Sequence, residues 1–175
     1  MEVFCYDMDM QTLSYSEASQ KDIPVISEIL KDATLRKVSY GDTVWGSTGW
    51  LDKEIQDSLN ESKMYIIRQG EDVVGTVSLQ WEDERSWGEQ PPVACYLHRL
   101  AIKDRYKGQG MGAATVDWAE QQAANNDRHL LRLDCEESNV RLCAYYEKLG
   151  FVKVGSKPIP EYGDYVAALY ESIIE

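Results

Sequence analysis

Apolar and polar residues alternate with two different periods along this chain, and these periods divide it into strands and helices. A period of two predicts strands over residues 11–17, 64–68, 73–81, 93–102, 129–135, 151–155 and 165–172. A period near 3.6 predicts helices over residues 19–38, 51–62, 113–125 and 140–148. The expected order of elements is therefore β-α-α-β-β-β-α-β-α-β-β, with a mostly antiparallel N-terminal half.

Turn and capping residues mark several ends of these elements. Within residues 19–38, Asp22 can cap the first helix and Pro24 then lies in its first turn, a pattern typical of a helix N-terminus. Residues 69–72 (QGED) predict a hairpin turn, and Gly150 is the expected C-cap of the last helix. Residues 40–50 (YGDTVWGSTGW) fit neither period, so we expect a loop there.

The length of 175 residues predicts one domain over residues 1–175, with residues 1–9 as a loose N-terminal extension. No repeat, linker or low-complexity tract divides the chain. No apolar run approaches the length of about 20 residues that a membrane span requires. The N-terminus lacks a basic region followed by an apolar stretch, which argues against a signal peptide. We therefore expect a cytoplasmic protein without a membrane partner.

Charge and the pattern of cysteines and histidines argue against nucleic-acid-binding, disulfide-bonded and metal-binding proteins. The net charge of −12 argues against a nucleic-acid-binding surface and is compatible with a cationic substrate, although an acidic, soluble surface is the simpler explanation of it. Three of the four cysteines lie in apolar segments, and none forms a CxxC pair, so we interpret them as reduced core residues. The two histidines are far apart in sequence and suggest no metal site.

The segment LAIKDRYKGQGMGAATVDWAE, residues 100–120, combines a strand end, a glycine-rich turn and the start of a helix. Such a turn leaves backbone N–H groups free at the positive end of a helix dipole, where they can bind phosphate. Glycines at 108, 110 and 112 would let a pyrophosphate approach the backbone. The spacing GxGxG differs from the dinucleotide-binding GxGxxG, and the Walker pattern is absent. A turn that only caps a helix is the simplest alternative.

A family resemblance supplies a third interpretation of this loop. LAIKDRYKGQGMG resembles the acetyl-CoA loop [RQ]xxGx[GA] of the GCN5-related N-acetyltransferases (GNAT), with Lys107 in place of the usual Arg or Gln. LRLDCEESNVRLCAYYEKLGFVKVG resembles the later family motif Nxx(A)xxxYEKxGF. The resemblance extends from about residue 12 almost to the end. It implies the α/β (α+β) GNAT acyl-CoA N-acyltransferase fold, with a mixed central sheet of about seven strands and about four helices.

The resemblance also implies an activity and a cofactor. The activity is transfer of an acetyl group from acetyl-CoA to a primary amine by direct attack in a ternary complex, with CoA as product. Strand-edge residues would pair with the pantetheine arm and the glycine loop would bind the pyrophosphate. The cofactor-binding residues implied in this way are Leu100, Ala101, Ile102, Lys107, Gly108, Gln109, Gly110, Met111, Gly112, Ala113, Asn139 and Tyr146.

Tyr146 occupies the position of the family's general acid. A phenol is protonated at neutral pH and can donate a proton to a departing thiolate. Its neighbour Tyr145 lies about 100° round the helix, so we expect Tyr145 to pack on the core instead. Asn139 matches the family's asparagine, and it is also a good N-cap for the following helix.

The general base is less clearly indicated. Where family members often carry a glutamate on the central strand, this sequence has Tyr96, which shares a strand face with His98 unless a bulge intervenes. Histidine titrates near neutral pH, so His98 could accept a proton through a water, or could simply pack on the strand. Other candidates are the carboxylates Glu82, Asp83, Glu84 and Asp134. An amine that arrives partly neutral would need no dedicated base.

The acceptor site is expected in the loops. Trp45 and Trp50 are candidate aromatic walls, with Tyr162 in the loop 158–164 and Glu82 as a candidate amine ligand. The acceptor would be a small molecule or a peptide, including a protein lysine or N-terminus. A non-catalytic acyl-CoA sensor and a purely structural domain remain alternatives. A homodimer is compatible with the resemblance, but no residue pattern indicates one.

Overall fold

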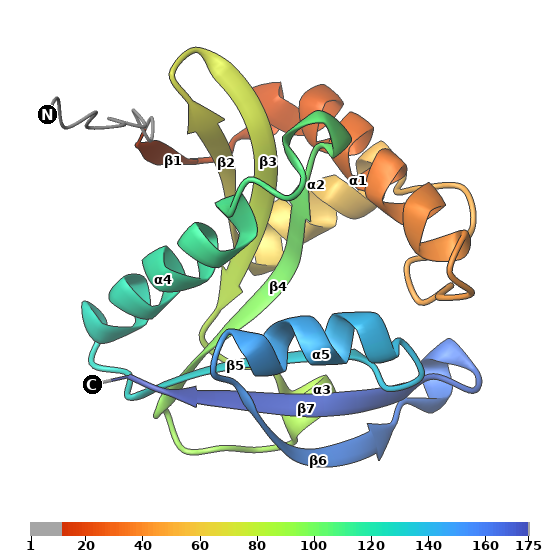
Figure 1. Cartoon of the computed structure of the whole chain (residues 1–175), viewed down its shortest axis with the longest axis vertical. Coiled ribbons are helices and arrows are strands. Elements are labelled where there is room, and N and C mark those ends of the chain that lie inside the picture. Colours follow the sequence, from red (N-terminus) through yellow and green to blue (C-terminus); the bar gives the residue numbers. More distant parts are fainter. Residues whose placement is uncertain (1–11, 175) are drawn as a thin grey trace, which may run out of the picture.

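A seven-stranded sheet forms the centre of this computed structural model, which describes residues 12–174 (Figure 1). The predicted N-terminal extension, residues 1–9, which includes Cys5, lies outside the described residues. The strands are β1 (Leu13–Glu17), β2 (Lys63–Gln69), β3 (Asp72–Gln80), β4 (Ala94–Ile102), β5 (Leu130–Glu136), β6 (Val152–Pro158) and β7 (Val166–Ile173). Their order in the sheet is β1-β2-β3-β4-β5-β7-β6.

The single parallel pair in the described sheet, β4 with β5, is also where the sheet opens. All other neighbouring strands are antiparallel. The β4–β5 register covers only Ala94–Tyr96 and its partners Leu130–Arg132. Beyond these residues the two strands diverge, as Figure 1 shows between α4 and α5. The edge of β4 that faces β5 is therefore free of strand pairing from Leu97 onward.

A bulge in β4 sets the direction of its side chains at this opening. Thr76 pairs with Ala101, but Ser78 pairs with His98, so one residue of β3 faces two residues of β4. Arg99 has the left-handed φ of 52°. The extra residue shifts the alternation, so Leu97 and Leu100 both pack on the same core cluster, although they are three positions apart.

Helices cover both faces of the sheet. The α-helices are α1 (Ile23–Val38), α2 (Asp52–Glu61), α3 (Glu84–Trp87), α4 (Met111–Ala124) and α5 (Val140–Lys148). The first two pack on one face through Ile26, Ile29, Leu30 and Ile55 of the helices. On the other face, α4 and α5 contribute Val116, Ala119, Ala123 and Tyr146 to the second core cluster.

The sequence predicted these elements with few errors. Asp22 is the N-cap residue of α1 with Pro24 in its first turn, and the left-handed Gly70 lies in the predicted hairpin turn. Gly150 is left-handed, with φ of 92°, but it follows the C-cap residue Leu149 instead of being the C-cap itself. The four long helices, the seven strands and the mixed sheet are confirmed.

Most predicted ends are shifted by one or two residues, and the larger differences concern one further helix and the ends of two elements. α3 lies inside the segment 82–92, because the Asp83 side chain accepts the Ser86 N–H and caps a single helical turn. The glycine loop ends earlier than expected, since α4 begins at Met111 and not at residue 113. β6 continues to Pro158 through its pairing with β7. Short 3-10 turns at 20–22, 104–106 and 160–162 were also not predicted.

Cys95, Cys135 and Cys143 are free thiols, the first two buried. Burial raises the pKa of the Cys95 thiol to about 12, so it stays protonated at neutral pH. Within residues 12–174, no helix has both the length and the apolar character needed to cross a membrane.

Candidate active site

The glycine loop before α4 presents free backbone donors. Gly108 and Gly110 have φ of 72° and 78°, a region that residues with a Cβ rarely adopt. The first hydrogen bond of α4 runs from the Ala114 N–H to the Gly110 carbonyl (3.0 Å). The N–H groups of the first helical residues therefore have no partner within the helix, and they lie at the positive end of its dipole. This arrangement fits a phosphate group.

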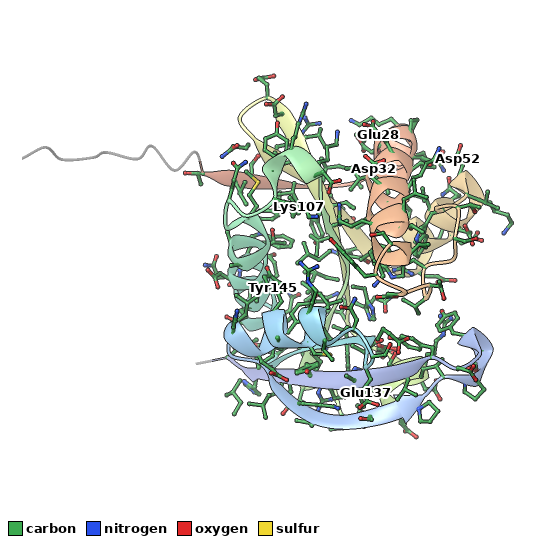
Figure 2. All side chains as sticks on the ribbon, turned by 45° about the vertical axis from the view of Figure 1, so that its right-hand side comes forward. Glu28, Asp32, Asp52, Lys107, Glu137 and Tyr145 are labelled. Carbon is green, nitrogen blue, oxygen red and sulfur yellow. The ribbon has the colours of Figure 1, made fainter. Side chains whose placement is uncertain are left out.

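Gly112 has a different role from the other two glycines. It lies inside α4, and a Cβ at this position would fall within contact distance of the Tyr145 hydroxyl. In Figure 2, Tyr145 lies between α5 and α4, and Lys107 lies near the start of α4. The family pattern allows Gly or Ala at position 112, but in this chain an added methyl would overlap the Tyr145 hydroxyl, which would have to move.

This contact predicts a specific coupling between the two residues. We expect Gly112→Ala to lower the free energy of unfolding by about 1–2 kcal/mol, because overpacking outweighs the gain in helix propensity. In a Tyr145→Phe background the nearest ring atom, Cζ, lies 3.5 Å from the added methyl, an ordinary contact. There Gly112→Ala should be neutral or stabilising by up to about 1 kcal/mol. Urea unfolding of the four proteins measures this coupling, and strictly additive effects would contradict it.

A cavity of about 720 Å³ occupies the opening between β4 and β5. It is continuous from Lys107, near the glycine loop, to the loops after α1 and β6. The sequence-predicted site residues that line it are Trp45, Trp50, Glu82, His98, Leu100, Lys107, Asn139, Tyr146 and Tyr162. Ala101, Ile102, Gly108, Gln109, Gly110, Met111, Gly112 and Ala113 are not among its lining residues. Ala101 and Met111 are buried in the two cores, so only their backbone groups could serve a ligand.

The two tyrosines of α5 are placed opposite to expectation. Tyr146 is the core residue, 9% exposed, with its ring 5.8 Å from that of Phe151. Tyr145 is 36% exposed, so the prediction that it packs on the core is wrong. The apolar stripe Leu142, Tyr146 and Leu149 on α5 is the sequence signal that indicates the inward face. Both tyrosines line the cavity, and burial raises the pKa of the Tyr146 phenol above its ordinary value.

His98 and Tyr96 are separated in the structure. Tyr96 is 2% exposed, packs near Trp87, and its hydroxyl lies 3.3 Å from Arg132 Nη1. It does not line the cavity, so its position gives no support to the predicted catalytic role. His98 does line the cavity, with its Nε2 3.2 Å from Oδ2 of Asp83.

Asp83 is held rigidly beside His98. Its side chain is only 7% exposed, and its Oδ1 accepts the Ser86 N–H at 3.1 Å. Burial alone would raise the pKa of this carboxyl, but His98 and the Ser86 N–H together keep the pKa below its ordinary value. Asp83 is therefore an anion at neutral pH, positioned to orient the imidazole and to stabilise its protonated form.

Asp134 of β5 joins these two residues across the opening. Potential ligand atoms of Asp83, His98 and Asp134 all lie within 4.8 Å of one another. Asp134 Oδ2 accepts the Tyr165 hydroxyl at 2.9 Å. The sequence suggested no metal pattern, because these residues are far apart along the chain, yet the fold brings two carboxylates and one imidazole together.

A hydrogen-bonded chain connects α5 to the loop after α1. Asn139 caps α5 through its Oδ1, which accepts the Leu142 N–H at 3.1 Å, so the predicted N-cap is confirmed. Its Nδ2 donates to Asp42 Oδ2 at 3.0 Å, and this 2%-exposed aspartate also pairs with Lys37. Neither Asp42 nor Lys37 was predicted to have a role. They fix the loop 40–50 against α5.

The aromatic wall is formed by residues on both sides of the cavity. Trp45 and Trp50 pack edge to face, with ring centroids 6.0 Å apart. Arg99 lies over the Trp50 ring at 5.0 Å. From the opposite side, Tyr162 accepts a hydrogen bond from Arg85 of α3. The wall therefore combines apolar surface with two guanidinium groups, which the sequence analysis had not singled out.

Comparison with known proteins agrees with this architecture. The model of the acetyltransferase (GNAT) family matches residues 27–151. The chain therefore belongs to the GNAT family, a family of transferases that use acetyl-CoA as acetyl donor and include N-acetyltransferases. The resemblance noted in the two sequence motifs is confirmed, and so is the fold class.

The individual relatives share less than a third of their aligned residues with this chain. The chain is 29% identical over 109 residues to the uncharacterized N-acetyltransferase YesJ of Bacillus subtilis, covering 59% of this chain and 60% of YesJ. Among solved structures, AAC(6')-Ib in complex with ribostamycin and coenzyme A has a TM-score of 0.73 and 17% identity over 93% of each chain. The acetyltransferase yncA of Salmonella typhimurium, solved with acetyl-CoA, has a TM-score of 0.67 and 14% identity over 94% of this chain and 95% of its own. At these identities the structural likeness concerns the fold alone.

The described residues fit acetyl-CoA as a ligand. The helix N-terminus and left-handed glycines suit the pyrophosphate, and the free edge of β4 suits an extended arm with amide groups. The cavity lies along this edge at Leu97–Leu100 and is also lined by Asp83. Its volume lies within the range of small-molecule sites.

Proposed function

We propose that this protein transfers an acetyl group from acetyl-CoA to the primary amine of a small molecule. The observation that carries the proposal is the opening between β4 and β5. It holds a cavity that begins at Lys107 of the glycine loop and is lined by a phenol and by a carboxylate–imidazole pair. A cavity of about 720 Å³ suits a small amine in preference to a folded protein segment.

In the proposed reaction, acetyl-CoA supplies the acetyl group as a thioester. The amine nitrogen forms a bond to the acetyl carbon, and the carbon–sulfur bond breaks. His98 accepts the proton that the amine loses, directly or through a water, and Asp83 stabilises the resulting imidazolium. Tyr146 donates a proton to the departing sulfur, which leaves as a thiol. Proton exchange with solvent returns both groups to their initial states.

Asp134 supports the amine in this proposal. Its Oδ1 is buried and has no hydrogen-bond partner among the described residues, so it can accept one from an ammonium or amine group. It lies within the same 4.8 Å group as Asp83 and His98. An arriving cation would therefore be drawn to the side of the cavity where its proton must be removed.

A thermal-shift titration followed by an amine screen tests the proposal. At 100 times the dissociation constant, acetyl-CoA should raise the free energy of unfolding by about 2.7 kcal/mol and the melting temperature by about 5–10 °C. NAD serves as the negative control. Release of CoA thiol with at least one amine of a broad panel is expected. Binding without thiol release would favour a sensor domain, and no shift with acetyl-CoA or CoA would refute the cofactor assignment.

A further inference from the structure

Buried polar atoms without partners are concentrated in the cavity. Among residues 12–174, such side-chain atoms of Trp50, Arg99 and Asp134 line it, and those of Trp87 and Arg128 do not. Asp83 Oδ2 and His98 Nε2 also line it, but they lie 3.2 Å from each other and so partner one another. Buried polar groups are normally hydrogen-bonded, because leaving them without a partner is costly. Their accumulation around one cavity indicates that a polar ligand completes their interactions.

Arg99 carries positive charge into this cavity. Its Nε and Nη1 are both buried without a partner, and no ion pair joins it to a carboxylate of the described chain. Burial lowers the pKa of its guanidinium, yet arginine remains charged in proteins. Glu61 and Asp83 lie near enough to influence it favourably, while Arg85 opposes it. The protein therefore leaves this charge only partly compensated.

The backbone holds Arg99 in a conformation that a non-glycine residue rarely adopts. It occupies the bulge of β4 with φ of 52°, and its guanidinium lies over Trp50 at 5.0 Å. Strained residues of this kind cluster at functional sites, where the surrounding structure fixes them. Arg99 follows His98 in the chain, and both residues line the same cavity, so the buried cation belongs to the cavity that holds the proposed reaction centre.

Negative charge lines the same cavity. Asp134 Oδ1 is buried without a hydrogen-bond partner in the described chain, and Asp83 Oδ2 lies 3.2 Å from His98 Nε2. Both carboxylates belong to the group around His98. The cavity thus presents the Arg99 cation together with two carboxylates, a set that is complementary to a small molecule with both charges.

We propose, on the basis of the acetyltransferase function above, that the acceptor is an amino acid: its carboxylate binds Arg99 while its amine lies against Asp134 and the Asp83–His98 pair. A guanidinium binds a carboxylate through charge-assisted hydrogen bonds, which are strong in a site that excludes water. Trp45 and Trp50 would contact the side chain of the acceptor. An amine without the carboxylate would leave the Arg99 charge uncompensated.

Matched acceptor pairs test this inference in the full-length protein. Phenylalanine is compared with phenethylamine, histidine with histamine, and lysine with cadaverine, by CoA release at saturating acetyl-CoA. We expect kcat/KM to be higher by about 10- to 100-fold for the best amino acid than for its decarboxylated amine, the range for one charge-assisted hydrogen bond. Equal or better use of the decarboxylated amines would overturn the inference. So would a preference for phosphoethanolamine over every amino acid.

Variants separate carboxylate binding from a structural role. Arg99→Gln should raise KM for the amino acid by about 10- to 100-fold and leave its kcat and the acetyl-CoA thermal shift nearly unchanged. Arg99→Lys should recover part of this loss. Arg128→Gln is the matched control, because Arg128 also has a buried Nε without a partner and stacks on a tryptophan, Trp81, but lies outside the cavity. Equal effects of Arg99→Gln on both members of a pair would indicate a structural role only.

A binding measurement distinguishes failure of this inference from failure of the proposed function. If no amine releases CoA, the catalytic proposal fails, but calorimetric titration of the same pairs into the protein with CoA still tests Arg99. Binding of an amino acid that is lost in Arg99→Gln would support the carboxylate site. Absence of binding by every amino acid, or equal binding by Arg99→Gln, would overturn it.

Discussion

Replacing Tyr146 with phenylalanine is expected to lower kcat by about 100- to 10,000-fold, the usual contribution of a general acid. The substitution keeps the ring that packs against Phe151 and Tyr170 and removes only the hydroxyl. Burial and neighbouring charges, and no hydrogen bond, raise the pKa of Tyr146, so removal of its hydroxyl leaves no orphaned partner among residues 12–174. Stability and the acetyl-CoA thermal shift should therefore stay close to those of the wild type.

Tyr145→Phe is the matched control for this prediction. Tyr145 is adjacent in sequence, lines the same cavity and has the same ring, but its hydroxyl approaches Gly112 of α4. We expect its kcat to remain within a few-fold of the wild type. A kcat in Tyr146→Phe that equals that of Tyr145→Phe at every pH would remove Tyr146 from the reaction.

The pH dependence of kcat follows from the direction of the Tyr146 pKa. An ordinary phenol loses its proton near pH 10, and burial raises the pKa of Tyr146 above that value. The protonated, donating form is thus retained throughout the range below pH 10 and is lost only at higher pH. The wild-type enzyme should show no decline in kcat due to Tyr146 between pH 7 and 10. A decline in this range that disappears in Tyr146→Phe would contradict the assignment.

Much of the fold was predictable because its signals are local. Periods of two and 3.6, together with turn residues such as Gly70 and Gly150, depend on neighbours within a few positions. α3 escaped detection because four residues are too few to show a period. The start of α4 was placed late because glycine usually marks a loop. Gly112 instead lies within the helix, where the absence of a Cβ leaves space for the Tyr145 hydroxyl.

The candidate site was predictable only where its residues lie in one motif. The glycine loop and Tyr146 belong to contiguous segments, so a single sequence sufficed to find them. Asp42 and Asn139 are 97 positions apart, and nothing in either segment indicates that they meet. Asp83, His98 and Asp134 likewise lie far apart in the chain. Asp83 is the N-cap of α3, His98 lies in β4 and Asp134 lies in β5. Their chemistry depends on the opening of the sheet, which the periodicity of the strands does not reveal.

Arg99 illustrates the same limit in one residue. On a regular strand it would point to the face opposite His98, because side chains alternate. The bulge changes this alternation and brings both residues to the same cavity. The sequence of β4 permits a bulge, but the pairing of β4 with β3 determines the position of that bulge. Residues at such irregular positions are therefore the ones that sequence analysis is least able to assign.

Replacing Gly110 with tryptophan should abolish the stabilisation by acetyl-CoA, so the expected shift of about 5–10 °C falls to nearly zero. Gly110 is the N-cap residue of α4 with φ of 78°, and a Cβ added there has no other part of the described protein within 4 Å beyond its chain neighbours. The indole would instead extend from the N-terminus of α4, into the space that the phosphates need. Because tryptophan would be held in the left-handed conformation, the free energy of unfolding of the unliganded variant should fall by about 1–2 kcal/mol.

Gly70→Trp provides the control that separates these two effects. Gly70 is also left-handed, with φ of 58°, but it lies in the β2–β3 turn, and no residue of that turn lines the cavity. Both variants should unfold at lower temperature without ligand, since both place a side chain at positive φ. Only Gly110→Trp should lose the response to acetyl-CoA, because only its side chain lies over the free N–H groups of α4. If both variants, or neither, lost that response, the glycine loop would not be the phosphate-binding site, and the acetyl donor would have to bind elsewhere along the opening between β4 and β5.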